Sequence, residues 1–419
     1  MQVEIEKLTF GGAGMARVNG KVVFVKGGLP GDVLKVKITK DKGSYAEAII
    51  EEVLRTSPER TQAPCPVFGE CGGCQLQHLK YPSQLIAKEN ILRETLERIG
   101  GLRGIEIEPI IPSLEEYRYR NRVTLSIWFQ KGRYRLGFYE EGSHKRVPIE
   151  GCPIASSIIN EAISRLDKFL SSIDNPRFPL VRIHIASDGT SAHISLVPSS
   201  EKDPKRLNGL RDQLKKSLET GCVSVAGYNE EEFEFNQSGL KFYSTPSVFI
   251  QSNREINERL VETLVEWSDL KGHERALDLY CGIGNFSLHM ARRAKEIVGV
   301  DVSAKAIKLA KKGAEANSIT NVNFDCSPSE LYAEESLIRG DKFDLVILDP
   351  PREGAKGILK ALGLLSPRKI IYVSCDPPTL ARDLKTLTEI GYNLIKIRPF
   401  DMFPQTYHIE SLALLSRLI

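Results

Sequence analysis

The sequence predicts an α/β fold, and three observations support this prediction. Beyond residue 246, apolar strand-like runs alternate with helical ones, which is typical of a parallel sheet with crossover helices. The first sixty residues alternate apolar and polar positions between glycine-containing turns, as a small closed β-barrel does. The region between them mixes strand-like and helical stretches, which indicates an α+β middle domain.

We therefore expect a barrel over residues 1–58, a middle domain over 59–245 and a sheet domain over 246–419. Residues 83–100 have amphipathic helical spacing and end at Gly100-Gly101, but the sequence does not say which neighbour this helix joins. The net charge of +3 is too small to indicate a polyanionic partner by itself. No long uncharged apolar run and no leader-like start occurs, so we expect a cytoplasmic protein without a membrane partner.

A glycine turn joins the first strand of the predicted sheet to a helix. The run LDLYCGIGNF places Gly282 and Gly284 in this turn, and Asp301 ends the next strand. Such a Rossmann-like layout holds a nucleoside, because the glycines allow close backbone approach and the carboxylate accepts hydrogen bonds from ribose hydroxyls. Ser287 replaces the third glycine of the dinucleotide pattern, which leaves less room for a pyrophosphate. The pattern therefore favours S-adenosylmethionine over NAD.

Two further motifs follow apolar runs at the predicted binding edge of the sheet. Asp349 begins DPPR, and Cys375 lies in SCDPP, so both stand at carboxyl ends of parallel strands. Cys375 also precedes a helix start, and a helix N-terminus stabilises a thiolate. A free cysteine is more often a small packing residue, but this position favours a nucleophile.

A nucleophilic cysteine beside a methyl donor suits one class of acceptor, a pyrimidine carbon too electron-poor to attack a methylsulfonium unaided. Addition of the thiolate to C6 makes C5 nucleophilic, and a base must later remove the C5 proton. Glu410, in QTYHIESLALL, is our candidate base, although a lone glutamate is usually a solvated surface residue. His408 is the competing candidate.

The cysteines near the start of the middle region form a separate motif, C-x5-C-x2-C, made by Cys65, Cys71 and Cys74. Such a cluster in a reducing compartment indicates a metal centre, and Cys152 is the best candidate for a fourth ligand. Four thiolates suit zinc and an iron-sulfur cluster about equally. We expect the remaining cysteines outside the predicted nucleophile to be packing residues: Cys222, Cys281 and Cys326.

Residues 117–135 are basic, contain no acidic side chain and interleave aromatic residues with arginine and lysine. Guanidinium groups that hold phosphates, next to aromatic rings that stack on bases, suit single-stranded RNA. Strand alternation offers a second interpretation, an aromatic core face with a solvated basic face. The basic residues of this stretch are Arg118, Arg120, Arg122, Lys131, Arg133 and Arg135.

The chain resembles the RNA 5-methyluridine methyltransferase family in five motifs that occur in order: LDLYCGIGNFS, VGVD, DPPR, SCDPPTLARDL and QTYHIE. The run LTFGGAGMARVNGKVVFVKGGLPGD resembles a TRAM domain, an oligonucleotide-binding-like barrel. The resemblance implies that Cys375 is the nucleophile and Glu410 the proton-abstracting base. The side chains that it implies in the methyl-donor site are Gln251, Tyr280, Asn285, Asp301 and Asp349.

The resemblance also implies a [4Fe-4S] cluster on Cys65, Cys71, Cys74 and Cys152, and that part of residues 83–110 packs on the catalytic domain. The implied substrate is a uridine of 23S rRNA, with a tRNA loop uridine as the alternative, and no protein partner is implied. The family commonly has Glu at the position of Asp301 and Asn at that of Asp376. Asp301 keeps its carboxylate for ribose, whereas Asp376 adds a negative charge beside the nucleophile.

Three rival functions stay open at this point. An RNA cytosine-C5 methyltransferase uses a similar cysteine adduct. A noncatalytic RNA-binding protein with a metal-sulfur centre is disfavoured by the presence of both Cys375 and Glu410. A small-molecule methyltransferase needs neither a barrel nor a basic aromatic stretch.

Overall fold

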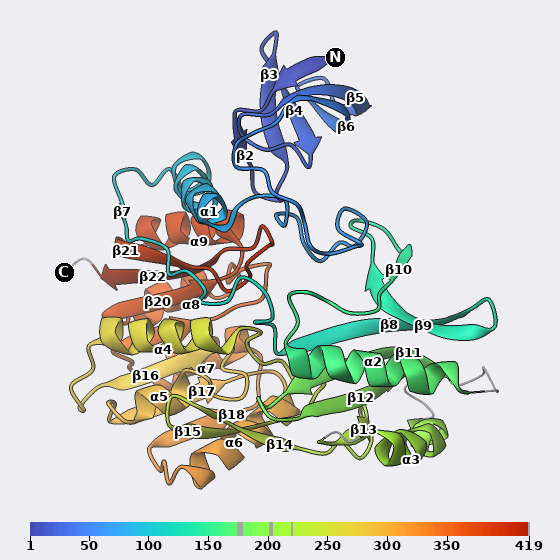
Figure 1. The fold of residues 1–419 in the computed structure, drawn as a ribbon. Helices are drawn as coiled ribbons and strands as arrows, with labels where there is room; N and C mark the ends of the chain where they lie inside the picture. Colours follow the sequence, from blue (N-terminus) through green and yellow to red (C-terminus); the bar gives the residue numbers. More distant parts are fainter. Residues whose placement is uncertain (174–178, 201–203, 219–220, 418–419) are drawn as a thin grey trace.

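The computed structural model describes residues 1–173, 179–200, 204–218 and 221–417 (Figure 1). It contains three sheets and one separate hairpin, arranged as a barrel, a middle sheet and a C-terminal sheet along the chain. Within these ranges, no helix has the length and apolar character that crossing a bilayer requires. The α/β fold with an N-terminal barrel is confirmed.

The barrel closes because its first strand is broken into two pieces that pair with different neighbours. The first piece, β1, pairs with β5, and the second piece, β2, pairs with β3. The two outermost strands of the order β1-β5-β6-β4-β3-β2 are therefore neighbours in the chain. Alternate residues such as Val23 and Val25 fill its interior, as the apolar and polar alternation predicts. The strands are β1 (Gln2–Glu4), β2 (Lys7–Leu8), β3 (Gly14–Val18), β4 (Lys21–Lys26), β5 (Val33–Asp41) and β6 (Tyr45–Arg55).

The helix after the cysteine motif packs on the C-terminal sheet, although the middle domain follows it in sequence. It comprises α1 (Tyr81–Thr95) and a π-helical turn η1 (Leu96–Gly100), and ends at Gly101 in the left-handed region. Leu92 and Leu96 are buried in the core of the C-terminal sheet. Strand β7 (Glu106–Ile107) then pairs with the edge strand β21 of that sheet.

The middle sheet has the order β10-β9-β8-β11-β12-β13, and helices α2 and α3 pack on it. Ser156 caps α2, and Ile159, Ile163 and Leu166 form its buried face. The elements are β8 (Arg122–Gln130), β9 (Arg133–Tyr139), β10 (Arg146–Pro148), α2 (Ser157–Ser171), β11 (Leu180–Ser187), β12 (Ala192–Pro198), η2 (Pro204–Leu207), α3 (Asn208–Ser217) and β13 (Val223–Val225).

A hairpin of β14 (Phe233–Gln237) and β15 (Leu240–Ser244) lies between the middle and C-terminal sheets in sequence. Its Phe235 and Phe242 share a core with Leu309 and Ala310 of helix α6. The hairpin therefore packs on the C-terminal sheet domain, whereas we predicted that this domain begins at residue 246. Periodicity alone does not reveal which core a short hairpin joins.

The C-terminal sheet has the order β18-β17-β16-β19-β20-β22-β21-β7, with strands β16 to β20 parallel and β22 antiparallel to its neighbours. Strand order reverses between β16 and β19, which opens a binding crevice at their carboxyl ends. The elements are α4 (Arg254–Ser268), β16 (Arg275–Leu279), α5 (Ser287–Ala291), β17 (Glu296–Val300), α6 (Ala304–Ala316), β18 (Val322–Asp325), α7 (Ser329–Arg339), β19 (Leu345–Leu348), α8 (Leu359–Leu365), β20 (Lys369–Ser374), α9 (Pro377–Glu389), β21 (Tyr392–Phe400) and β22 (Glu410–Arg417).

Candidate active site

A cavity of about 1050 Å³ lies at the carboxyl edge of the C-terminal sheet and reaches the cysteine motif and the first strand of the middle sheet. We call it the central cavity. It is lined by every predicted site residue except Gly284 and Asn285: Cys65, Cys71, Cys74, Cys152, Gln251, Tyr280, Gly282, Asp301, Asp349, Cys375 and Glu410. The fold thus brings the predicted nucleophile, base, donor-site residues and cysteine cluster to one space.

Strand pairing brings the predicted nucleophile and base together. Ser374, the last residue of β20, is registered opposite Ser411 of the antiparallel β22. Cys375 follows Ser374 and Glu410 precedes Ser411, so they are juxtaposed at the same sheet edge. Asp349 follows the neighbouring strand β19 and reaches the same edge. The site can therefore present a sulfur and a carboxyl group to one ligand.

The thiol of Cys375 is held in its protonated form. Burial raises the pKa of Cys375 to about 12, with further increases from Glu410, Asp349 and Asp376 and an opposing effect of Arg352. Burial and the carboxyl groups act against the stabilisation of the thiolate that we expect from the helix N-terminus. Reaction at Cys375 requires a change that favours the thiolate.

The carboxyl groups of the site also resist ionisation. Burial raises the pKa of Glu410 well above its usual range, and Asp349 adds to this effect. Burial, together with the buried Asp278, raises the pKa of Asp349 to about 7. Acidic groups that repel one another in a buried space are stabilised by a cation. The charge pattern of the site thus fits a positively charged ligand such as a sulfonium.

The glycine turn has the geometry of a nucleoside site. The carboxylate of Asp301 accepts hydrogen bonds from the Gly282 N–H at 2.9 Å and the Ser303 N–H at 2.8 Å. A carboxylate has about four lone-pair positions, so both oxygens can still accept from ribose hydroxyls. Tyr280 takes the left-handed conformation at φ +66°, and its hydroxyl donates to Glu330 at 2.9 Å. The turn is fixed before any ligand binds.

Two predicted donor-site residues, Asn285 and Gly284, do not line the central cavity. The side-chain amide of Asn285 pairs reciprocally with that of Asn257 at 3.0 Å, and Asn285 does not line the central cavity. Gly284 has φ +84°, and a Cβ there would lie 3.1 Å from Phe324. Both residues thus help to shape the turn and its packing, and their predicted part in the methyl-donor site stays a prediction.

The four predicted cluster cysteines form one wall of the central cavity. Burial raises the pKa of Cys74 to about 12, and the neighbouring Cys152, Cys71 and Cys65 raise it further. We call residues 65–74, which carry Cys65, Cys71 and Cys74, the cysteine loop. The N–H of Gly72 in this loop donates to the Tyr139 carbonyl of the middle sheet at 2.9 Å. Within the described ranges, no three His, Cys, Asp or Glu side chains are arranged around a single metal ion.

This arrangement is relevant to the type of centre that the cysteines could hold. A tetrahedral zinc ion, with bonds of about 2.3 Å, needs thiolates in mutual contact at roughly 3.8 Å. An iron-sulfur cluster places iron and sulfide between the thiolates and needs a wider spacing. The four thiols line one wall of the central cavity, and the type of centre that they hold stays a prediction.

The other cysteines were predicted to be packing residues. Cys222 and Cys281 are buried, as expected. Cys326 is exposed, so the prediction is wrong for this residue. It follows the end of the edge strand β18, where no neighbouring strand covers it.

The basic aromatic stretch divides between core and cavity. Tyr119 and Tyr134 are buried, whereas Arg120 and Arg122 line the central cavity. The guanidinium of Arg122 lies 5.9 Å from the ring centre of Phe249, which is 59% exposed. Two aromatic residues of the stretch thus belong to the core and two of its arginines reach the cavity, while contact of these arginines with RNA stays a prediction.

Sequence reasoning assigned no role to three other residues of the central cavity: Arg352, Phe249 and Phe403. Arg352 stands in the DPPR motif, so the motif could have marked it. Its Nη2 lies 3.4 Å from Nε2 of His408. Phe249 and Phe403 are single aromatic residues in loops, and no sequence pattern marks them.

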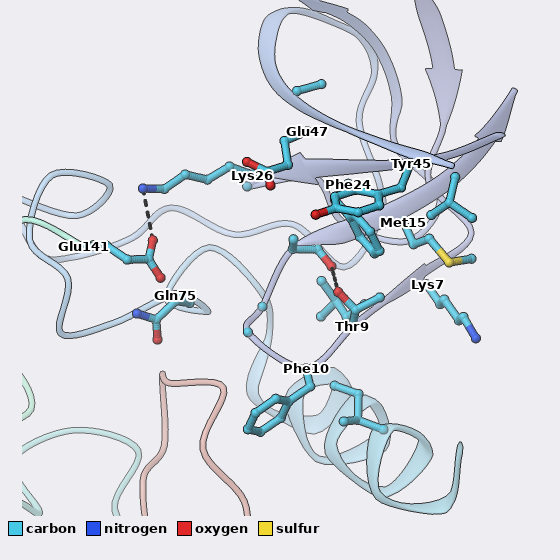
Figure 2. A pocket seen from close by; sticks show the side chains of 18 of the residues that line it. Lys7, Thr9, Phe10, Met15, Phe24, Lys26, Tyr45, Glu47, Gln75 and Glu141 are labelled. Atoms are coloured by element: carbon cyan, nitrogen blue, oxygen red, sulfur yellow. Dashed lines mark hydrogen bonds and ion pairs between the residues drawn. The ribbon is translucent and has the colours of Figure 1, made fainter. Parts of the chain in front are cut away.

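A second hollow of about 1460 Å³ lies between the barrel, α1 and the cysteine loop (Figure 2). Figure 2 shows Phe24 and Tyr45 on neighbouring barrel strands, with ring centres 5.7 Å apart. Lys26 reaches from the barrel to Glu141 of the middle domain at 3.1 Å. Cys71 and Cys74 line both hollows, so the cysteine loop separates them.

Comparisons with known proteins agree with this geometry. Residues 80–418 match the family model of tRNA (Uracil-5-)-methyltransferase, and residues 1–50 match that of the TRAM domain. A 23S rRNA (uracil(1939)-C(5))-methyltransferase of Shewanella amazonensis is 36% identical over 98% of this chain and 94% of its own length. Its counterpart in Aliivibrio fischeri is 33% identical over 100% of this chain and 96% of its own length.

A solved structure is similar over the same extent. The tRNA (uracil-54, C5)-methyltransferase of Pyrococcus abyssi, in complex with S-adenosyl-L-homocysteine, superposes with a TM-score of 0.75 at 26% identity. The match covers 99% of this chain and 100% of that one. All three relatives extend across the barrel, the middle domain and the C-terminal sheet.

Proposed function

Since this chain belongs to the family of S-adenosylmethionine-dependent RNA uracil-C5 methyltransferases, we propose that it methylates C5 of a uridine in 23S rRNA, with Cys375 as nucleophile and Glu410 as base. The observation that carries the assignment of residues is the facing placement of these two side chains at the ends of β20 and β22. Asp349 and Asp301 extend the same cavity toward the methyl donor.

The chemistry follows from this placement. The Cys375 thiol gives its proton to solvent, and its sulfur bonds to C6 of the uracil while the electron pair of the C5–C6 double bond moves toward C5 and O4. C5 then forms a bond to the methyl carbon, whose bond to the donor sulfur breaks with both electrons remaining on that sulfur. Glu410 takes the C5 proton, the C5–C6 double bond forms again, and the bond from C6 to Cys375 breaks.

The electrostatics of the free site explain how these steps are ordered. The pKa values of Cys375, Asp349 and Glu410 are all raised, chiefly by burial. The sulfonium of S-adenosylmethionine brings a positive charge next to these groups and so favours their ionised forms. We infer that the thiolate and the carboxylate base become available once the donor is bound, which limits unproductive reaction of Cys375.

We propose that Cys65, Cys71, Cys74 and Cys152, which line one wall of the central cavity, would hold a [4Fe-4S] cluster. The proposed methyl transfer involves no net electron transfer, so such a cluster would supply no redox step. Its ligands come from the cysteine loop and from the middle domain, so it would join the two as a staple beside the RNA cavity.

Ribosomal RNA is the preferred substrate because the rRNA-specific relative is 36% identical to this chain, whereas the tRNA-specific structure is 26% identical. The tRNA alternative retains support from that second protein, which matches along its whole length. In either RNA the target base must leave its stack to reach Cys375, which favours a loop nucleotide.

The test is methylation of 23S rRNA and bulk tRNA that lack 5-methyluridine, followed by nucleoside mass spectrometry. We expect 5-methyluridine in the rRNA and none in the tRNA. 5-Methyluridine in tRNA alone would transfer the assignment to the tRNA alternative. 5-Methylcytidine in either RNA would contradict the uracil specificity.

A further inference from the structure

The segment of residues 401–409 joins β21 to β22 and leads directly into Glu410; we call it the base segment. Phe403 and His408 of this segment line the central cavity. It has no regular strand or helix of its own, and Gln405 takes the left-handed conformation at φ +69°. A loop of this kind keeps one conformation only where its surroundings impose it.

Helix α1 holds the base segment through a buried ion pair. Lys88 and Asp401 are both fully buried, and Lys88 Nζ donates to Asp401 Oδ1 at 2.5 Å and to the Phe403 carbonyl at 3.1 Å. A buried ion pair adds little stability over an apolar pair of similar volume, because desolvation offsets the attraction. The pair instead fixes the position of the base segment, because one ammonium group binds both the Asp401 carboxylate and the Phe403 carbonyl.

A neutral contact repeats the arrangement one turn away on α1. The side chain of Gln84 donates to Oε1 of Gln405 at 2.9 Å and accepts from the backbone N–H of Gln405 at 3.0 Å. The backbone N–H groups of Gln75 and Leu76 donate to the carbonyl of Gln405 at 3.1 and 2.9 Å. Gln75 directly follows Cys74, so the base segment is bonded next to the end of the cysteine loop as well as to α1.

We propose that Lys88 and Gln84 are positioning residues for proton abstraction, which hold the base segment so that Glu410 reaches the C5 proton. The inference rests on the proposed function, because it requires Glu410 to be the base. Neither residue lines the central cavity, so neither contacts the reacting atoms. We expect their effect mainly on the step that Glu410 performs, because Cys375 follows β20 on another loop.

The test separates these two steps with RNA that carries unmodified uridine, C5-tritiated uridine or 5-fluorouridine. Because removing Lys88 alone would leave Asp401 charged and buried, the main variant is Lys88→Met with Asp401→Leu, and the second is Gln84→Leu. The matched control is Lys80→Met, since Lys80 is exposed just before the same helix. Glu410→Gln serves as the reference for a missing base.

We expect the first two variants to accumulate a denaturation-resistant protein–RNA adduct, as the Glu410→Gln reference does, and to release tritium roughly tenfold to a hundredfold more slowly. Adduct formation with 5-fluorouridine RNA should stay close to the unmodified protein, and the control should behave normally. Equal loss of adduct formation and tritium release, or no change in either, would overturn the inference. If the Glu410→Gln reference itself accumulates no adduct, the assignment of the base fails, and the inference falls with it.

Discussion

Replacement of Asp301 by Asn should weaken binding of the methyl donor and its demethylated product. The carboxylate bonds to the N–H groups of Gly282 and Ser303 and has lone pairs left for two ribose hydroxyls. Asn keeps one acceptor oxygen and turns an NH₂ group toward the second hydroxyl. The loss of one charge-assisted hydrogen bond costs about 1.5–3 kcal/mol. This corresponds to a roughly tenfold to hundredfold higher Kd.

Isothermal titration with S-adenosylhomocysteine measures this change without any RNA. Asp301→Glu restores the longer side chain common in the family and should bind within about threefold of the unmodified protein. Asp325→Asn is the matched control, because Asp325 ends the neighbouring strand β18 and does not line the central cavity. A Kd for Asp301→Asn within twofold of the unmodified value, with normal thermal unfolding, would refute the ribose assignment.

Two further predictions concern the cysteines. Alkylation of the nucleophilic thiol by iodoacetamide at pH 9, followed by peptide mass spectrometry, should be faster in Asp349→Asn and slower in Arg352→Gln. These residues raise and lower the thiol pKa, respectively, and each pKa unit changes the thiolate fraction about tenfold. Asp349, with a pKa of about 7, is ionised at that pH; equal rates in both variants would contradict the electrostatic account. Cys152→Ser should lose bound iron and the visible absorbance of anaerobically purified protein, whereas Cys222→Ser should keep both, and unchanged iron in the former would reject that ligand.

The sequence predicted the placement of most of the site because parallel strands end at one edge of a sheet. Asp349 and Cys375 follow apolar runs, and each reaches the central cavity for that reason. Glu410 was harder to predict, because strand β22 runs antiparallel and Glu410 is its first residue rather than its last. Reasoning from the residues named Glu410 only as a candidate beside His408, and the resemblance to a known family then favoured Glu410.

The features that the sequence did not predict share a physical cause. Each depends on contacts between residues that lie far apart in the chain. The thiol pKa of Cys375 depends on burial and on Glu410 and Asp349 from two other strands, whereas the sequence shows only the adjacent helix and Asp376. The amide of Asn285, in the glycine turn, pairs with that of Asn257 on helix α4. The ion pair of Lys88 with Asp401 joins residues more than three hundred positions apart, and neither stands in a motif.

The central claim is that Cys375 forms a covalent bond with a uracil and that a C5 proton must then be removed. It is tested most directly by incubating the protein with the methyl donor and 5-fluorouridine-containing rRNA, then separating products on a denaturing gel. Fluorine at C5 cannot be removed as a proton, so the account predicts a stable protein–RNA complex whose linked peptide contains Cys375, and no complex with Cys375→Ala. A complex that persists in Cys375→Ala, or none with the unmodified protein despite bound donor, would contradict the account.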